Sequence, residues 1–407
     1  MFDYIMIEGF RSFKHVALEM PRLAVLIGPN GGGKSNLLDS LMLLSEAGRG
    51  ELNLGINGRG GFRDVAFGFD PSHEVRIEFR FTEVLDQIFQ PAALPPDAAP
   101  DKRAPCARFW VGLRSVGSNF RVWEEQLRVE RPDDASLSIP IAMVRRDATQ
   151  TIFVWSQGHE EKDSEPKTVI DVELAISQVR DANNYPVQNA ILQQFQGWTF
   201  YRDIDVGPDS PVRQPALLRS DIRLSPNGSN LSSVFYAIQQ DHPDSWAEIL
   251  EIVHTAYPEF ERLTVRGEGG DGKVILRWSE RPFEQQAGLS ANLLSDGTLK
   301  LLCLIAILKN PTPPPLICID EPELGLHPDW IELVAELLQD AAMRTQVIVA
   351  THSPHIVAKM KPEQVIVAEK ENGETSLTHL SAEDLEKWLR DFNLAELWLA
   401  GHFGGRP

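Results

Sequence analysis

The most constraining feature of this 407-residue sequence is the glycine-rich segment GPNGGGKS at residues 28–35. It fits the pattern GxxxxGK[ST], and it lies between an apolar run at 23–27 and apolar residues at helical spacing at 37–44. Glycines allow a tight turn in which backbone N–H groups point inward and hold a phosphate chain together with the N-terminus of the next helix. The sequence therefore predicts a phosphate-binding loop between a buried strand and a helix.

Each residue of this loop has an expected part in binding a nucleoside triphosphate. Lys34 is expected to reach the β- and γ-phosphates, and the hydroxyl of Ser35 is expected to ligate Mg²⁺. The other loop residues expected at the phosphates are Gly28, Pro29, Asn30, Gly31, Gly32, Gly33 and Asn36. The alternative is a glycine-rich turn without a ligand, which the strand before the loop and the helix after it make less favoured.

Two acidic residues follow a second apolar run. Residues 316–319 are apolar and lead directly into Asp320 and Glu321, which places both carboxylates at the carboxyl end of a buried strand, where ligands bind in parallel sheets. Asp320 is expected to hold Mg²⁺, directly or through water, and Glu321 to orient or deprotonate the attacking water. Acids also follow strands simply because loops are solvated, so this role depends on the phosphate loop.

The composition excludes several classes of protein. The chain is 43% hydrophobic and 24% charged, as is typical of globular proteins, and its apolar stretches are shorter than the roughly 20 residues that span a bilayer. Three scattered cysteines and an N-terminus unlike a signal peptide favour a cytoplasmic protein with no membrane partner. The net charge of −19 argues against nonspecific coating of nucleic acid, but a local nucleic-acid contact stays open.

Three further segments follow in a particular order: LSDGT at 294–298, ELGLHP at 323–328 and VIVATH at 347–352. With the loop and the acids, they resemble the ATP-binding-cassette (ABC) ATPases. Within these ATPases the sequence resembles the SMC/RecF-like branch in particular, which includes the AAA-type ATPases of the overcoming-lysogenization-defect and phage-defence group. GPNGGGKS is similar to the Walker A motif of this family, LSDGT to its LSGGQ signature, CIDEPE to Walker B, ELGLHP to the D-loop and THSP to the switch histidine.

The resemblance implies an α/β fold. We expect an ABC-type ATPase head with a P-loop mixed sheet, an N-terminal antiparallel β part and an inserted helical and β lid subdomain. The expected regions are 1–85 as the N-terminal half of the head with Walker A, 86–285 as the inserted lid or arm, 286–370 as the C-terminal half with the signature, Walker B and switch histidine, and 371–407 as a helical tail.

The resemblance also implies how the motifs act. In this family two heads stack face to face, and each ATP lies between the Walker A motif of one head and the signature of the other. Ser295 and the backbone N–H of Gly297 would then contact the γ-phosphate of the partner's ATP. The residues expected in catalysis are Glu321, Lys34 and His352, of which His352 would contact the phosphate held by its own head.

The opening IEGFRSFKHVALEM is similar to the first strands of RecF and the SMC-related repair ATPases. By this resemblance Arg11 is expected to line the nucleotide pocket. The signature departs from the family pattern, because Asp296 and Thr298 stand where LSGGQ has glycine and glutamine. No glutamine lies between residues 50 and 85, where the Q-loop of this family is expected.

These features predict an ATP-hydrolysing head that forms an ATP-dependent homodimer or higher oligomer and gates a nucleic-acid-linked effector in prokaryotic anti-phage defence or DNA repair. Too few residues follow His352 for the TOPRIM nuclease domain found in this branch, so a separately encoded effector such as a TOPRIM-type nuclease is expected. A weakly hydrolysing scaffold is the alternative, and Asp296 suits it. A transport ATPase is less favoured, because Lys34 and Ser295 are farther apart than in a compact transport cassette.

The segment 382–399 is predicted to be helical and carries Trp388 and Trp398. It is a candidate docking site for the effector, and the alternative is a helix packed on its own domain.

Overall fold

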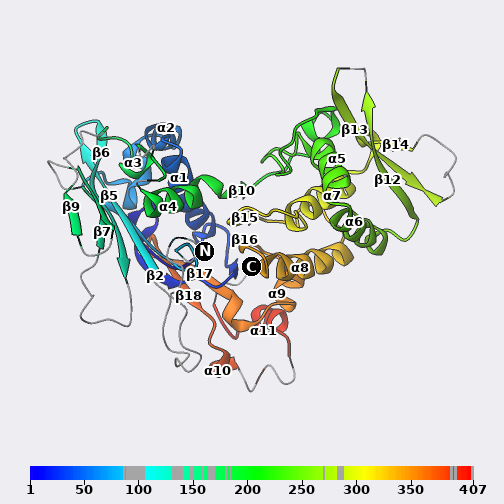
Figure 1. The fold of residues 1–407 in the computed structure, drawn as a ribbon. Coiled ribbons are helices and arrows are strands. Elements are labelled where there is room, and N and C mark those ends of the chain that lie inside the picture. The colour runs from blue at the N-terminus through cyan, green and yellow to red at the C-terminus, as the bar shows by residue number, and fades with distance from the viewer. Residues whose placement is uncertain are drawn as a thin grey trace, which may run out of the picture. The chain divides into compact units, whose positions relative to one another are not determined.

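The computed structural model describes residues 1–85, 88, 106–130, 141–146, 151–157, 160–163, 170–178, 181–183, 185–268, 271–281, 288–385, 388 and 392–404. The chain forms two compact units, whose elements are drawn in Figure 1. Unit 1 comprises Met1–Pro21, Gly28–Trp198 and Val367–Thr378, and unit 2 comprises Arg22–Ile27, Thr199–Ile366 and His379–Pro407. The expected boundaries at 85/86 and 285/286 involve residues outside the described ranges, so the four-region division stays a prediction.

Unit 1 contains an eight-stranded antiparallel sheet with the strand order β2-β1-β4-β5-β6-β7-β8-β9. The strands are β1 (Phe2–Phe10), β2 (Phe13–Glu19), β4 (Val75–Phe81), β5 (Cys106–Val116), β6 (Asn119–Glu130), β7 (Ile141–Arg146), β8 (Thr151–Gln157) and β9 (Glu160–Asp163). In β4 every second side chain is buried, as expected for an extended strand with one face in the core. This sheet is the antiparallel β part that the sequence predicted.

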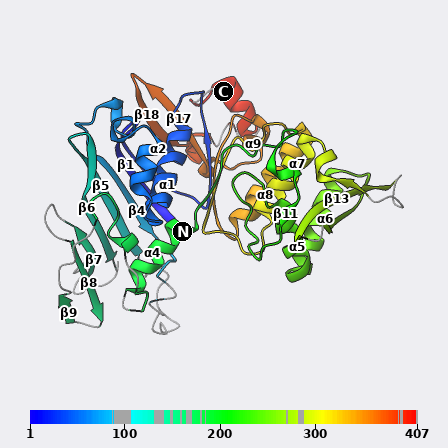
Figure 2. The same ribbon diagram turned by 90° about the horizontal axis from the view of Figure 1, so that it is seen from above.

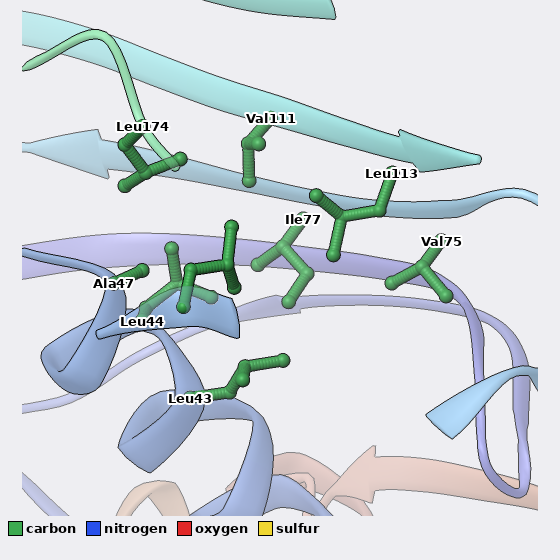
Figure 3. Close-up of a pocket in the computed structure, with 9 residues that line it drawn as sticks. Leu43, Leu44, Ala47, Val75, Ile77, Val111, Leu113 and Leu174 are labelled. Carbon is green, nitrogen blue, oxygen red and sulfur yellow. The ribbon is translucent and has the colours of Figure 1, made fainter. Parts of the chain in front are cut away.

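Helices cover the apolar face of this sheet, as Figure 2 shows for α1 (Lys34–Gly48) and α4 (Pro186–Gly197). Phe195 of α4 contacts Phe79 of β4 and Phe109 of β5, with ring centroids 5.8 and 5.2 Å apart. Figure 3 shows leucines of α1 facing Val75 and Ile77 of β4 around a cavity of about 10 Å³. This volume holds at most one water molecule, so the cavity is a feature of core packing. The shorter helices of unit 1 are α2 (Leu52–Gly58), α3 (Phe62–Val65), η1 (Phe67–Phe69) and η2 (Ile176–Gln178).

The other face of the sheet carries cross-strand ion pairs. Arg76 pairs with Glu124 at 2.9 Å, and Arg108 pairs with Glu78 at 2.9 Å. These arginines are about one-third exposed. Arg108 of β5 pairs with a carboxylate on the adjacent strand β4, and Arg76 of β4 reaches across β5 to a carboxylate on β6. The face therefore carries both positive and negative side chains, paired across the strands.

Unit 2 contains parallel strands in the order β10-β15-β16-β3. They are β10 (Thr199–Tyr201), β15 (Leu316–Asp320), β16 (Gln346–Ala350) and β3 (Leu23–Ile27), and the sheet order continues through β17 (Val365–Glu371) and β18 (Glu374–His379). All five residues of β3 and of β16 are buried, as expected for central strands covered on both faces. Their carboxyl ends therefore share one edge of the sheet.

A second sheet of unit 2 has the order β11-β13-β12, with β14 paired to β13. Its strands are β11 (Ala216–Leu217), β12 (Phe260–Glu268), β13 (Lys273–Glu280) and β14 (Leu289–Ser290). The helices of unit 2 are α5 (Leu231–Asp241), α6 (Pro243–Ala256), α7 (Asp296–Leu308), α8 (Pro328–Ala342), α9 (Pro354–Ala358), α10 (Ala382–Leu385) and α11 (Leu394–Ala400), with the 3-10 turns η3 (Pro211–Arg213), η5 (Ala291–Leu293) and η6 (Pro362–Gln364). No helix in the described ranges has the length and apolar composition needed to cross a bilayer.

The helix α4 begins at Pro186, because a proline fits the first turn of a helix and not its interior. The C-terminal tail differs from the sequence expectation. The tail was expected to be helical from residue 371, but Glu374–His379 form β18, in which Thr375 and Leu377 are buried and their neighbours are not. In α11 the ring of Trp398 is fully buried, and α11 packs against α9 of the same unit.

Candidate functional site

The phosphate loop is held in a conformation that requires glycine. Gly33, the N-cap of α1, has a φ of 105°, and a Cβ there would lie 2.5 Å from Oγ1 of Thr375. Gly28 has a φ of 148°, and a Cβ there would lie 2.1 Å from the carbonyl oxygen of Ala368. Both positions combine a left-handed backbone with a close approach of other residues, so no larger side chain fits without moving the loop.

The amine of Lys34 lies within this loop. Its Nζ donates to the carbonyl oxygens of Gly28 at 2.8 Å and Pro29 at 3.2 Å, and the residue is only 5% exposed. The next residue, Ser35, is exposed in the first turn of α1. A cation and a hydroxyl thus lie at the N-terminus of a 15-residue helix, whose dipole favours a bound anion.

Two residues that the sequence analysis did not single out support the loop. The hydroxyl of Thr375 in β18 donates to the carbonyl oxygen of Gly32 at 3.1 Å, and its oxygen lies 2.8 Å from the hydroxyl oxygen of Ser12, within hydrogen-bond distance. Ser12 in turn accepts from the Asn36 side chain at 2.6 Å. Ser12 adjoins Arg11 in a segment already identified by resemblance, but nothing in the sequence near Thr375 marks it as a loop contact.

Arg11 contacts the helix that follows the loop. Its guanidinium pairs with Asp39 at 2.8 Å and donates to the Asn36 side chain at 3.4 Å, and its backbone has a φ of 49°. Asp39 also pairs with Arg59, which is hydrogen-bonded to Glu46. Burial alone would lower the pKa of Arg59, but the hydrogen bonds to these two carboxylates raise it. Arg11 is therefore anchored next to the loop by a network on α1.

The residues predicted to be catalytic in unit 2 follow two adjacent parallel strands, β15 and β16. Asp320 ends β15 and is in register with Ala350, the last residue of β16. Glu321 has a φ of 51°, and its N–H donates to the carbonyl oxygen of Ala350 at 2.8 Å. This turn brings Oε1 of Glu321 to 3.7 Å from Nε2 of His352. The structure thus brings together two residues predicted to be catalytic from separate motifs.

Glu323 fixes the segment that carries this histidine. Its Oε1 accepts from the hydroxyl of Thr351 at 2.7 Å and from the backbone N–H of His352 at 2.8 Å. Thr351 is fully buried, and its Oγ1 also accepts from the N–H of Ser353 at 2.9 Å. Glu323 is the first residue of the segment that resembles the D-loop, and nothing in the sequence pattern predicts this contact.

The signature segment forms the N-terminus of α7. Ser295 is the N-cap, and its Oγ accepts from the N–H of Thr298 at 3.1 Å. A Cβ on Gly297 would lie 3.1 Å from the carbonyl oxygen of Gly325, so α7 closely approaches the segment that resembles the D-loop. Asp296 pairs with Arg213 through an Nη2–Oδ1 contact of 2.5 Å.

The predicted residues thus form groups within each unit. Unit 1 brings Arg11 next to the helix that follows the loop 28–36. In unit 2, Glu321, which follows Asp320 in the sequence, lies near His352. In the same unit, the segment with Ser295 and Gly297 lies beside the D-loop segment. Within the residues that the structure describes, no group of three or more His, Cys, Asp and Glu side chains is arranged to hold a metal ion by itself.

Comparison with known proteins gives a family match and a likeness of fold. The family described as "AAA domain, putative AbiEii toxin, Type IV TA system" matches residues 23–87 and 198–358, more than half of the chain. The "Retron Vc95 probable ATPase" of Vibrio cholerae serotype O1 biovar El Tor is 34% identical over 74 residues, which are 18% of this chain and only 14% of that protein.

Two solved structures of Smc heads cover nearly the whole chain. A crystal structure of the Smc head bound to the C-terminal winged-helix domain of ScpA has a TM-score of 0.53 at 15% identity, covering 94% of this chain and 98% of that one. An Smc head with an extended coiled coil, bound to the C-terminal domain of ScpA derived from Pyrococcus furiosus, has a TM-score of 0.49 at 13% identity, with 96% and 98% covered. The first of these shows that the fold is that of an SMC-type ATPase head.

Proposed function

The chain belongs to this family of AAA domains, and from that premise we propose that it is an ATP-driven switch that dimerises on ATP and gates a separate effector. It is an ATPase with the fold of an SMC head. The observation that carries the proposal is the pairing of the Glu321 carboxylate with His352 at 3.7 Å. A carboxylate beside an imidazole, at the carboxyl edge of a parallel sheet, supplies the two groups that hydrolysis of a phosphoanhydride needs.

Binding of ATP is assigned to the loop 28–36. Its backbone N–H groups and the N-terminus of α1 hold the phosphates, and the Lys34 amine moves from the carbonyl oxygens of Gly28 and Pro29 to the β- and γ-phosphates. The residues assigned to Mg²⁺ are Ser35 and Asp320, both oxygen donors, which suits an ion that takes its remaining ligands from water and phosphate. When bound, Mg²⁺ neutralises the negative charge that accumulates on the phosphates.

Hydrolysis is assigned to Glu321 and His352. Glu321 accepts the proton of the attacking water, and His352 hydrogen-bonds the γ-phosphate and holds it in line. The left-handed backbone at Glu321, with its N–H bonded to Ala350, fixes the carboxylate relative to the imidazole. Such pre-organisation lowers the cost of orienting both groups during the reaction.

Dimerisation is assigned to the face that carries the signature. Ser295 and the N–H of Gly297 contact the γ-phosphate held by a second copy of the chain. Two large apolar side chains adjoin this segment and the D-loop segment that packs on it: Leu293 is 66% exposed and Leu324 is 58% exposed. Apolar side chains exposed beside a phosphate-binding helix terminus support an interface that forms when nucleotide is present.

The proposed effector is inferred from the family description and from the name of one relative. The family description names a toxin of a toxin–antitoxin system, and one relative belongs to a retron. Both support a role in prokaryotic defence or DNA repair, with a separately encoded effector such as a TOPRIM-type nuclease acting on nucleic acid. An alternative is a scaffold that binds ATP and hydrolyses it slowly, which the acid Asp296 in the signature favours.

The decisive experiment measures hydrolysis and assembly together. We expect the purified chain to hydrolyse ATP, with Lys34→Ala at the background rate, and Glu321→Gln to bind ATP and accumulate as a dimer in sedimentation. Hydrolysis without any ATP-dependent dimer would refute the stacked-head mechanism. Dimers without a rate above that of Lys34→Ala would favour the scaffold, and stimulation by DNA would show that the chain itself senses nucleic acid.

A further inference from the structure

A buried arginine far from the signature in sequence holds the signature segment in place. Arg213 is only 5% exposed. Its Nε donates to the carbonyl oxygens of Val206 at 2.9 Å and Gly207 at 2.8 Å, and its Nη1 donates to those of Asn292 at 3.2 Å and Leu294 at 2.7 Å. The guanidinium thus joins the loop after β10 to the turn that leads into α7.

The third nitrogen of this guanidinium, Nη2, contacts the residue after the N-cap of α7. Nη2 of Arg213 pairs with Oδ1 of Asp296, whose side chain is 63% exposed. Arg213 therefore contacts Leu294 and Asp296, the residues on either side of Ser295. Because a guanidinium is planar and rigid, holding both neighbours restricts the orientation of the N-cap between them.

The ion pair between Arg213 and Asp296 also offsets the repulsion that an acid in the signature would exert on a phosphate. A carboxylate at the first position of α7 lies where the helix N-terminus would attract a phosphate, so an unpaired Asp296 would repel that phosphate. With Arg213 beside it, the pair carries no net charge, and the carboxylate is turned toward the guanidinium. The Ser295 hydroxyl and the Gly297 N–H are then left as the polar groups at the helix terminus.

We propose that Arg213 is a positioning residue for the signature. It orients the N-terminus of α7 and neutralises Asp296, so that a sequence with an acid in its signature still accepts the γ-phosphate of a second copy. The proposal rests on the ATP-dependent dimer put forward above. It explains why an acid in this motif need not abolish assembly.

The first test needs neither nucleotide nor a dimer. Asp296→Asn removes the negative charge of the carboxylate that pairs with Arg213 and leaves the bonds from Arg213 to the four carbonyls in place. We expect amide hydrogen exchange of the segment 291–299 to rise by about threefold or more, as for a weakened charged contact. Asp244→Asn removes an exposed acid from the first turn of α6, and controls for the loss of a helix-dipole interaction alone. Equal exchange in Asp296→Asn and the wild type would overturn the proposal.

The second test asks whether the charge pair matters for assembly. In the Glu321→Gln background, we expect Arg213→Met to weaken the ATP-dependent dimer by about tenfold or more, because Asp296 is then unpaired. Adding Asp296→Asn to Arg213→Met should restore most of that loss. A purely structural role for Arg213 predicts no such rescue, so a double variant as weak as Arg213→Met would contradict the proposal.

The two tests separate this inference from the proposed function. If Arg213→Met does not melt cooperatively, Arg213→Gln replaces it, since a glutamine keeps hydrogen-bond donors and loses the charge, and the same rescue is expected. If the Glu321→Gln chain itself never dimerises, the proposed function fails, and hydrogen exchange still decides whether Arg213 and Asp296 order the signature.

Discussion

The carboxylate of Glu323 accepts a hydrogen bond from the backbone N–H of His352 at 2.8 Å. The same oxygen accepts from the buried hydroxyl of Thr351, so one side chain in the D-loop segment fixes the segment that carries the histidine. Because His352 lies next to Glu321, the position of Glu323 bears on the hydrolysis proposed for these two residues.

Replacement of Glu323 should therefore lower the rate of hydrolysis more than the affinity for ATP. Hydrogen bonds to a charged group contribute about 1.5–3 kcal/mol, so we expect Glu323→Ala to reduce kcat by about tenfold or more and to change nucleotide affinity by less than about threefold. Steady-state hydrolysis and titration with a fluorescent nucleotide measure the two effects. Glu332→Ala, on the exposed side of α8, is the control. An equal loss of affinity and rate would contradict this role.

Lys34 should be required for nucleotide binding. Its buried amine is the positive charge inside the loop, so we expect Lys34→Met, which keeps the apolar stem, to weaken ATP binding by about a hundredfold, as for loss of a charged contact. Lys14→Met removes an exposed lysine and should bind ATP like the wild type. Titration with a nonhydrolysable analogue measures both, and tight binding by Lys34→Met would rule out the assigned site.

The loop glycines should differ in their tolerance of alanine. Gly31 and Gly33 both have positive φ, so alanine at either costs about 1–2 kcal/mol of backbone strain. A Cβ at Gly31 meets nothing within 4 Å, whereas one at Gly33 meets Thr375. We expect Gly33→Ala to lower both the free energy of unfolding and the ATP affinity more than Gly31→Ala. Urea denaturation and nucleotide titration compare them, and identical losses would mean that the contact with Thr375 does not matter.

The parts of the fold that follow from local pattern were predictable. The sequence predicted a buried strand at 23–27, a helix that includes 37–44 and a buried strand at 316–319, and the structure has β3, α1 and β15 at these places. Apolar periodicity, the prolines and the glycines of the loop are all encoded within a few neighbouring residues. The family match and the likeness to an SMC head confirm the fold inferred from these motifs.

The contacts that complete the site depend on residues far apart in the chain. Thr375 supports Gly32 from 343 residues away, and Arg213 pairs with Asp296 from 83 residues away. Four aspartates lie near Arg213 in the sequence, so the sequence does not indicate that the more distant Asp296 is its partner. The alternating pattern around Thr375 does not indicate that its hydroxyl contacts the loop. The burial of Arg213 and its bonds to four carbonyls make it an internal residue. Such long-range pairs are fixed by tertiary packing, which local pattern does not encode.

Lys300 gives the chain a stability that depends on pH. This lysine of α7 is 7% exposed, and burial lowers the pKa of its amine although Cys303, Asp203 and Glu323 raise it in part. Because the pKa in the folded state lies below the unfolded value, the folded chain binds fewer protons between the two values. The contribution of Lys300 to stability is therefore unfavourable below its folded pKa, and the cost is relieved as the pH rises toward 10.5.

Lys300→Met should accordingly stabilise the chain at neutral pH. We expect the free energy of unfolding to rise by on the order of 1 kcal/mol at pH 7, because a buried cation is replaced by an apolar side chain of similar length. The gain should shrink as the pH increases, since the wild-type amine loses its proton. Urea denaturation at pH 7, 8.5 and 9.5 measures the difference, with the exposed Lys361→Met as control. A gain that is constant with pH would show that methionine stabilises by packing alone, and a loss at every pH would show that the charge of Lys300 is stabilising.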